Sequence, residues 1–215
     1  MTLIQKLKPP LNDAEANALH DGNFAQSHFV GKNPFNEESA NVVVDYSGHL
    51  FYEKGGRVNF IDLGAGSGDM SLEIARVLSG LGLDHRAQVI AVDYDADKLN
   101  LKESGERVGV IFIAASLNDL PFDTRTSKVV GHTEQKNKFV IVSRAVTQYY
   151  ASDLAKPGEQ FSSEQATLYN YYLERFEPGT IFIDIISTGD AIGINRFAYI
   201  LNKINGKHLH YLTPG

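Results

Sequence analysis

The central stretch of the sequence is Val58-Asn59-Phe60-Ile61-Asp62-Leu63-Gly64-Ala65-Gly66-Ser67-Gly68-Asp69. A short apolar run ends here in three glycines, each separated from the next by one residue. From Asp69 to Leu81 the apolar residues then recur at helical spacing. Glycine permits positive φ and lets the main chain come close to a ligand. The order therefore predicts a strand, a tight ligand-facing loop and a helix.

Similar apolar runs recur along the rest of the chain. They predict strands over residues 87–93, 108–114, 138–143 and 180–186, and a helix over 95–104. The runs are nearly continuous rather than alternating, which is typical of parallel strands that are buried on both faces. The predicted fold class is α/β, with a doubly wound, mostly parallel, Rossmann-like sheet flanked by helices.

Composition limits the classes of function. The chain has 215 residues, of which 43% are hydrophobic and 21% charged, and its formal net charge is −6. An acidic chain is a poor partner for nucleic acid, because such binding depends on basic patches. Without cysteine it can form neither a disulfide nor a thiolate nucleophile. No run approaches the roughly 18 apolar residues of a membrane span, and we expect a cytoplasmic protein.

The glycine loop allows a choice between two kinds of cofactor. A dinucleotide fingerprint would need a third glycine at position 69, but Asp69 stands there, and a carboxylate at the start of a helix opposes a diphosphate. The spacing D-x-G-x-G-x-G instead resembles the first motif of the class I S-adenosylmethionine-dependent methyltransferases, small-molecule type. This cofactor has no phosphate, and Asp62 and the bare main chain suit its amino-acid end.

The second predicted strand ends in an acidic residue, Asp93. An aspartate at this place can accept hydrogen bonds from both ribose hydroxyls of a nucleoside cofactor. We expect Tyr94, beside it, to lie against the adenine. The alternative interpretation, in which Asp93 caps a helix that begins at Asp95, stays open.

Two further segments are similar to later motifs of the family. In Ala115-Ser116-Leu117-Asn118-Asp119-Leu120-Pro121-Phe122 the resemblance assigns the adenine contact to Ser116 and the main chain of Leu117, although Ser116 departs from the usual acid and a plain turn is the alternative. After the fourth strand, Ser143 is assigned to the methionine part. Glu177-Pro178-Gly179-Thr180 resembles the turn before the family's fifth strand.

The resemblance therefore implies a set of cofactor-binding residues. They are Asp62, Gly64, Ala65, Gly66, Ser67, Gly68, Asp93, Tyr94, Ser116, Leu117 and Ser143. It implies that residues 57–215 form a Rossmann-like domain binding S-adenosyl-L-methionine. Residues 1–56 are expected to form a helical extension or cap, with a capped helix start at 11–15 and a second helix from Glu37 to Glu53.

The expected activity is methyl transfer to a small-molecule acceptor, with a protein acceptor less favoured. The Asn/Asp-Pro-Pro-aromatic tetrad of enzymes that methylate nucleic acid is absent. A base is needed only for some acceptors; His28, His132, Tyr149 and Tyr150 are candidates, and no catalytic residue and no metal site is assigned. The alternatives are a catalytically silent methyltransferase-like binding or interaction module and an NAD-dependent oxidoreductase, which Asp69 opposes.

The C-terminal part of the sequence is expected to depart from the family fold. Residues Ala191 to Ile204 are predicted to form a helix and Lys207 to Leu212 a strand, after which the chain ends. The final strand of the family sheet is then missing. An open edge invites pairing, so we expect the sheet to be completed by a segment of a longer protein, by the N-terminal extension, or by a second copy in a homo-oligomer.

Overall fold

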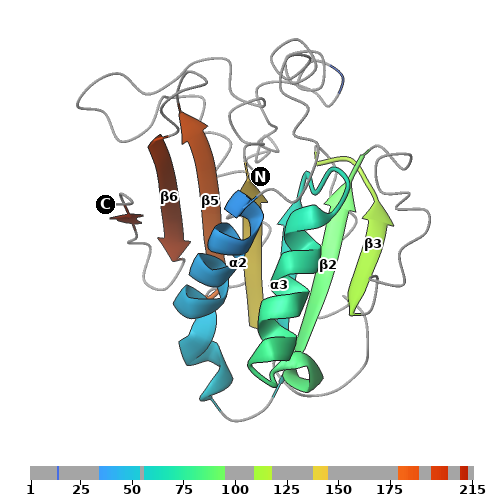
Figure 1. The fold of residues 1–215 in the computed structure, drawn as a ribbon, viewed down its shortest axis with the longest axis vertical. Coiled ribbons are helices and arrows are strands. Elements are labelled where there is room, and N and C mark those ends of the chain that lie inside the picture. Colours follow the sequence, from blue (N-terminus) through green and yellow to red (C-terminus); the bar gives the residue numbers. More distant parts are fainter. Residues whose placement is uncertain are drawn as a thin grey trace, which may run out of the picture.

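A seven-stranded sheet forms the centre of the fold. The computed structural model describes residue 14 and residues 34–53, 56–94, 109–117, 138–144, 179–188, 195–202 and 209–212. The strands lie in the order β3-β2-β1-β4-β5-β6-β7, and helices α2 and α3 lie side by side on one face (Figure 1). The elements are α2 (Pro34–Ser47), η1 (Gly48–Phe51), β1 (Val58–Leu63), α3 (Asp69–Gly80), η2 (Asp84–Arg86), β2 (Ala87–Asp93), β3 (Val110–Ala114), β4 (Lys138–Arg144), β5 (Ile181–Thr188), β6 (Asn195–Asn202) and β7 (Leu209–Leu212).

Five strands of the sheet are parallel. Strands β3, β2, β1, β4 and β5 run in one direction, so their carboxyl ends lie along the same edge, which is the upper edge in Figure 1. The chain builds outward from β1 to β3 on one side and continues with β4 and β5 on the other. The order therefore reverses between β1 and β4, and such a switch point is where open α/β sheets bind ligands.

The register fixes which residues meet at the switch point. Leu63, the last residue of β1, pairs with Val92 of β2 on one side and with Ser143 of β4 on the other. Ser143 in turn pairs with Asp184 of β5. The glycine loop begins at the residue after Leu63, so it leaves the sheet directly above this row.

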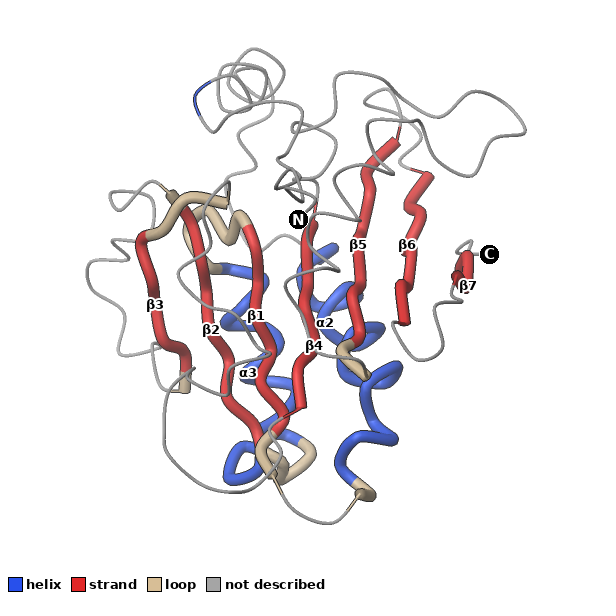
Figure 2. The backbone as a smooth tube through the Cα atoms, turned by 180° about the vertical axis from the view of Figure 1, so that it is seen from behind, coloured by secondary structure: helices blue, strands red, loops and turns tan. Residues whose placement is uncertain are grey.

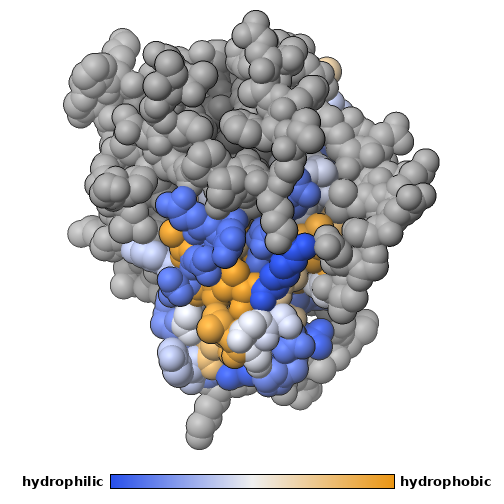
Figure 3. All heavy atoms as spheres, in the orientation of Figure 1, coloured by the Kyte–Doolittle hydropathy of each residue, from blue (hydrophilic) through white to orange (hydrophobic). Residues whose placement is uncertain are grey.

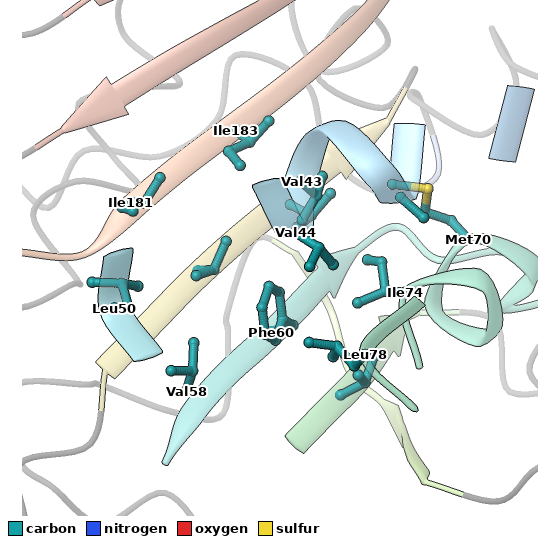
Figure 4. Close-up of a cluster of buried hydrophobic side chains, with 14 of the residues drawn as sticks. Val43, Val44, Leu50, Val58, Phe60, Met70, Ile74, Leu78, Ile181 and Ile183 are labelled. Carbon is teal, nitrogen blue, oxygen red and sulfur yellow. The ribbon is translucent and has the colours of Figure 1, made fainter. Parts of the chain in front are cut away.

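The core lies on both faces of the sheet. Alternate residues of β1, β4 and β5 pack beneath α2 and α3, and Figure 4 shows them converging with the helix side chains. Residues of this cluster include Val43, Val44, Val58, Phe60, Met70, Ile74, Leu78, Val140, Val142, Ile181 and Ile183. The intervening residues Ile61, Leu63, Ile141 and Phe182 point to the opposite face and are fully buried as well. Burial of both faces explains the continuous apolar runs in the sequence.

Helices α2 and α3 form the layer over the first face. Tyr46 of α2 and Ala75 and Val77 of α3 are partly buried and pack against the cluster. On the helical side, hydrophobic residues are exposed among hydrophilic ones (Figure 3). In the view from the opposite side, the strands lie in front of the two helices (Figure 2). No helix within the described ranges combines the length and the apolar character that crossing a bilayer requires.

Most predicted elements are confirmed. The predicted strands over 58–63 and 87–93 coincide with β1 and β2, and those at 108–114, 138–143 and 180–186 differ from the observed strands by at most two residues at either end. The doubly wound, mostly parallel α/β fold class is therefore correct. The predicted helix over 95–104 and nearly all of the helix start at 11–15 lie outside the described residues.

The predicted helix from Glu37 to Glu53 is correct only in part. The α-helix begins at Pro34, whose missing N–H is not needed in a first turn, and it ends at Ser47. The Ser47 hydroxyl donates to the main-chain oxygen of Val43, at 2.7 Å, and Gly48 follows as a poor helix former. The chain then tightens into the 3-10 turn η1. The division of the chain at residue 56 stays a prediction.

The C-terminal expectation is wrong in two respects. Residues Asn195–Asn202, predicted to be helical, form strand β6, which pairs antiparallel with β5 along its whole length. The predicted strand before the end of the chain is confirmed as β7, which pairs antiparallel with β6. The sheet has seven strands, so the expectation of a missing last strand is wrong, whereas pairing of an edge strand with another segment or a second copy stays a prediction. Aromatic and β-branched residues such as Phe197 and Ile200 favour a strand once β5 offers an edge.

One lysine connects the helical layer to the sheet. Lys138 begins β4, and its Nζ donates to the main-chain oxygen of Leu50, at 2.7 Å, while Glu53 Oε2 lies 3.0 Å away. The Lys138 side chain is 14% exposed and that of Glu53 is 60% exposed. The shielded contact to η1 is therefore the stronger of the two, because water screens the ion pair.

We predict that Lys138→Met lowers the free energy of unfolding by about 1–2 kcal/mol, because it removes a hydrogen bond from a charged donor but keeps the aliphatic stem. Glu53→Gln is the matched control and should cost less than about 1 kcal/mol. Urea denaturation measures both values. If both variants lowered the free energy of unfolding equally, the contact of Lys138 with Leu50 would not be stronger than its ion pair with Glu53.

Candidate functional site

The loop after β1 is fastened to the end of β2. The main-chain N–H groups of Gly64 and Ala65 both donate to the main-chain oxygen of Val92, at 2.8 and 3.0 Å. Gly68 N–H donates back to the main-chain oxygen of Ala65, at 2.8 Å, and closes a tight turn. The loop is therefore held against the switch point rather than projecting from it.

All three glycines of the loop have positive φ. The values are 68° at Gly64, 56° at Gly66 and 84° at Gly68, a region that other residues rarely adopt. A Cβ built at Gly66 would meet no protein atom within 4 Å. Glycine is therefore required there by the backbone conformation, and the main chain of Gly66 faces open space that a ligand can fill.

Asp93 joins the second strand to the glycine loop. Its Oδ2 accepts a hydrogen bond from Gly66 N–H at 2.8 Å, and the residue is only 7% exposed. Its main-chain oxygen accepts from Ala115 N–H at 2.8 Å, just beyond β3. One residue therefore connects the ends of β1, β2 and β3. The two most specific elements of the sequence, the glycine loop and this acid, are in direct contact.

Asp62 lies inside the protein rather than on the loop surface. It points to the face covered by α3, and its Oδ2 accepts a hydrogen bond from Ser71 Oγ at 2.6 Å. Both side chains are buried. The contact fixes the start of α3 against β1, which in turn fixes the two ends of the glycine loop. Ser71 could not be predicted as a site residue from the sequence, because its role depends on which turn of the helix faces the strand.

Helix α3 begins where the glycine loop ends. Gly68 is its N-terminal cap residue, and its main-chain oxygen accepts from Leu72 N–H at 2.9 Å. Ser67 Oγ donates to Asp69 Oδ2 at 2.9 Å on the exposed side of the first turn. A carboxylate therefore stands beside the main-chain amides of the helix start, a place where phosphates often bind.

The other predicted site residues lie along the same sheet edge. Tyr94, 37% exposed, follows Asp93, whereas Ser116 is half-buried and Leu117 buried after β3. Ser143 is buried near the end of β4, and its Oγ has no hydrogen-bond partner within the part of the chain that the structure describes. The strand ends thus bring all of the predicted residues to one edge, while their contacts with a cofactor stay predictions.

Some sequence candidates fall outside the described residues. These are His28, His132, Tyr149 and Tyr150, and residues 118–122 of the segment that resembles a later motif of the family lie outside as well. Gly179 has φ of 93°, as expected for the glycine of the turn before β5. Asp184, buried in the middle of β5, was missed; its only signal was a single acid within the apolar run Ile181-Phe182-Ile183-Asp184-Ile185. Within the described ranges, no three acidic or histidine side chains gather to hold a metal ion.

Comparison with solved structures finds distant likenesses to methyltransferases. The plantazolicin methyltransferase BpumL, in complex with a monoazolic desmethylPZN analog and SAH, is 13% identical; the match covers 81% of this chain and 53% of that chain, with a TM-score of 0.44. The DszA carbon methyltransferase is 11% identical; the match covers 78% of this chain and 39% of that chain, with a TM-score of 0.47. A putative protein-L-isoaspartate O-methyltransferase from Plasmodium falciparum, in complex with S-adenosyl-L-homocysteine, is 16% identical. The match covers 88% of this chain and 75% of that chain, with a TM-score of 0.45.

These likenesses are too weak to carry an argument about function. The chain spans about half the length of the BpumL protein, at 53%. No family model matches the sequence, and neither does any curated protein. The assignment of the fold accordingly rests on the strand order and register described above.

We predict that Ser71→Ala lowers the free energy of unfolding by about 1–3 kcal/mol, because it removes a hydrogen bond to a buried carboxyl group. Ser67→Ala is the matched control: it deletes the exposed serine–aspartate contact of 2.9 Å and should change stability by less than about 0.5 kcal/mol. Urea denaturation of both variants is the measurement. A Ser71→Ala protein as stable as Ser67→Ala would contradict the role given to the buried pair.

Proposed function

We propose that the chain is an S-adenosylmethionine-dependent methyltransferase that acts on a small-molecule acceptor. The observation that carries the proposal is the contact of Asp93 Oδ2 with Gly66 N–H, at 2.8 Å, in a loop of positive-φ glycines. It joins an acid at the end of β2 to bare main chain at the end of β1. A nucleoside with an amino-acid tail needs both within reach of one another.

The chemistry of the loop favours a cofactor without phosphate. Asp69 lies in the first turn of α3, beside the main-chain amides with which the helix begins. Carboxylates around a helix start repel a diphosphate but tolerate a cationic ligand. S-adenosylmethionine carries a sulfonium and an ammonium, which fits this charge, and the NAD alternative is disfavoured for the same reason.

Asp93 is proposed to have two roles. One is to hold the loop through Gly66, as described above. The other is to accept the ribose hydroxyls, since a carboxylate offers about four lone-pair positions and can accept from a ligand as well as from the main chain. Tyr94 is proposed to lie against the adenine, with Ser116 and the main chain of Leu117 at its edge.

The chain's own contribution to the reaction is alignment. When bound, the cofactor supplies an activated methyl group that an acceptor displaces in line. The loop from Gly64 to Gly68 holds the amino-acid end, Asp93 fixes the ribose, and the buried strand ends keep water away from the reacting atoms. A strong base is not required for every acceptor, so the proposal names no catalytic residue.

The acceptor is proposed to be a small molecule. The net charge of −6 disfavours nucleic acid, and a protein side chain is the second choice. A catalytically silent binding module is the alternative function. It is favoured by Ser116, which stands where the family usually has an acid for the adenine.

Titration calorimetry of the full chain tests the proposal. We expect S-adenosylmethionine and S-adenosylhomocysteine to bind and NAD not to bind, because only the former lack a diphosphate. Transfer of a labelled methyl group to an acceptor from a panel of small molecules then separates an enzyme from a silent binder. Binding of NAD alone, or of none of the three ligands, would overturn the proposal.

A pair of glycine variants separates binding from stability. Gly66 and Gly82 have similar φ, 56° and 68°, and a Cβ at either would meet no protein atom within 4 Å. We predict that Gly66→Ala and Gly82→Ala each lower the free energy of unfolding by about 1–2 kcal/mol. Only Gly66→Ala should weaken binding of S-adenosylmethionine, by about tenfold or more.

One outcome of the titrations of Gly66→Ala and Gly82→Ala would contradict the proposal. Equal affinities of the two variants for S-adenosylmethionine, with wild-type binding intact, would mean that the ligand does not approach the main chain of Gly66. Thermal or urea unfolding confirms that both variants are folded under the titration conditions.

A further inference from the structure

One buried hydrogen bond closes the glycine loop into a ring. Ser71 Oγ donates to Asp62 Oδ2 at 2.6 Å, and the two residues are nine positions apart in the chain. Asp62 lies at the end of β1, whereas Ser71 lies in the first turn of α3. The loop from Gly64 to Gly68 is contained entirely within this ring. The bond therefore holds together the place where the loop leaves the strand and the place where it enters the helix.

Both members of this pair are buried. Ser71 is 0% and Asp62 is 2% exposed. Asp62 points to the face of the sheet that the helices cover, because side chains alternate along β1 and Phe60 belongs to the core cluster on that face. The main chain of Gly66, by contrast, faces open space. A ligand on the loop therefore meets its main chain, and the pair lies behind the loop.

The loop is held at two separate points. The pair of Asp62 and Ser71 holds its base, and the contact of Gly66 N–H with Asp93 Oδ2, at 2.8 Å, holds its centre. The proposed function assigns the ribose to Asp93 and the amino-acid end to the main chain from Gly64 to Gly68. Loss of the contact at the base leaves the contact at Asp93 in place. It should therefore disturb the amino-acid end more than the ribose.

We propose that Ser71 and Asp62 are positioning residues for the amino-acid end of the cofactor and that neither of them touches it. The inference rests on the proposed function and moves Asp62 from the set of ligand contacts to the layer behind the loop. Main-chain groups bind a ligand only within a narrow range of distances and angles. A small shift of the loop therefore weakens several of its hydrogen bonds at once.

The alternative role of Asp62 is a direct ion pair with the ammonium group of the cofactor. The ammonium would then have to reach a carboxylate that is almost fully buried and whose Oδ2 already accepts from Ser71. Bringing a charged group out of water to such a position is costly. The two roles also predict different results, because only an ion pair depends on the amine of the ligand.

The test uses three ligands that differ in the amino-acid end. S-adenosylhomocysteine carries the whole end, its deaminated analogue keeps the carboxylate but lacks the amine, and 5′-methylthioadenosine ends in a methylthio group. Each is titrated by calorimetry into the full chain and its variants, the weaker ligands by displacement. We expect Ser71→Ala and Asp62→Asn each to weaken the two ligands that have a carboxylate tail by the same factor, about fivefold, and 5′-methylthioadenosine by less than about twofold.

Lys138→Met is the matched control for lost stability. Its expected cost is similar to that of Ser71→Ala, but Lys138 begins β4 and contacts η1, at the end of the sheet away from the glycine loop. It should change none of the three affinities. A control that weakened the ligands as much as Ser71→Ala would show that lost stability alone accounts for the effect.

The outcomes distinguish this inference from the proposed function. If the wild type does not bind S-adenosylhomocysteine, the proposed function fails and this inference fails with it. If it binds, a larger loss for S-adenosylhomocysteine than for the deaminated analogue in Asp62→Asn would indicate an ion pair and overturn the positioning role alone. Equal losses for all three ligands, or no loss, would overturn it as well. Should Asp62→Asn fail to fold, Ser71→Ala decides by the difference between ligands with and without the carboxylate tail.

Discussion

The hydrogen bond from Gly66 N–H to Asp93 Oδ2 is the contact on which the geometry of the site depends. A loop of three positive-φ glycines has many conformations available and little side-chain packing to select one. The acid at the end of β2 selects one by holding the central glycine. Because Asp93 also anchors Ala115 through its main-chain oxygen, the ends of three neighbouring strands share one fixed arrangement. The position of each predicted site residue along this edge is set relative to that contact.

Because both faces of the sheet are buried, polar residues of the site that point to opposite faces have different surroundings. The alternation of β1 turns Asp62 toward α3, where Ser71 satisfies it, whereas the next residue, Leu63, faces the other side. The row that continues from Leu63 to Ser143 and Asp184 lies on that second face. Asp62 therefore stabilises the junction of loop and helix from inside the protein. Ser143, on the second face, has no such partner among the described residues.

The bounds of a helix or strand could be predicted from the sequence where neighbouring residues determine them. Strands β1 and β2 were predicted to the residue because each apolar run begins and ends at a change of composition, and α3 because glycine precedes its helical spacing. The prediction failed over 195–202, where a mixed pattern permits helix or strand and the edge of β5 decides. The partnership of Asp62 with Ser71 and the adjacency of Ser143 and Asp184 were out of reach for the same reason. Both depend on register and helix rotation, which one sequence does not encode locally.

The charges around the glycine loop indicate the class of ligand more specifically than the conformation of the loop does. Glycine loops before helices serve phosphates and other ligands alike, because main-chain N–H groups attract any electron-rich group. Here Asp69 stands in the first turn of the helix, and Asp62, Asp93 and Asp184 are buried within the strands that lead to the same edge. Asp69 raises the cost of bringing a diphosphate to the start of the helix and lowers that of a cation. The charge at the helix start therefore supports the proposed ligand, a positively charged nucleoside.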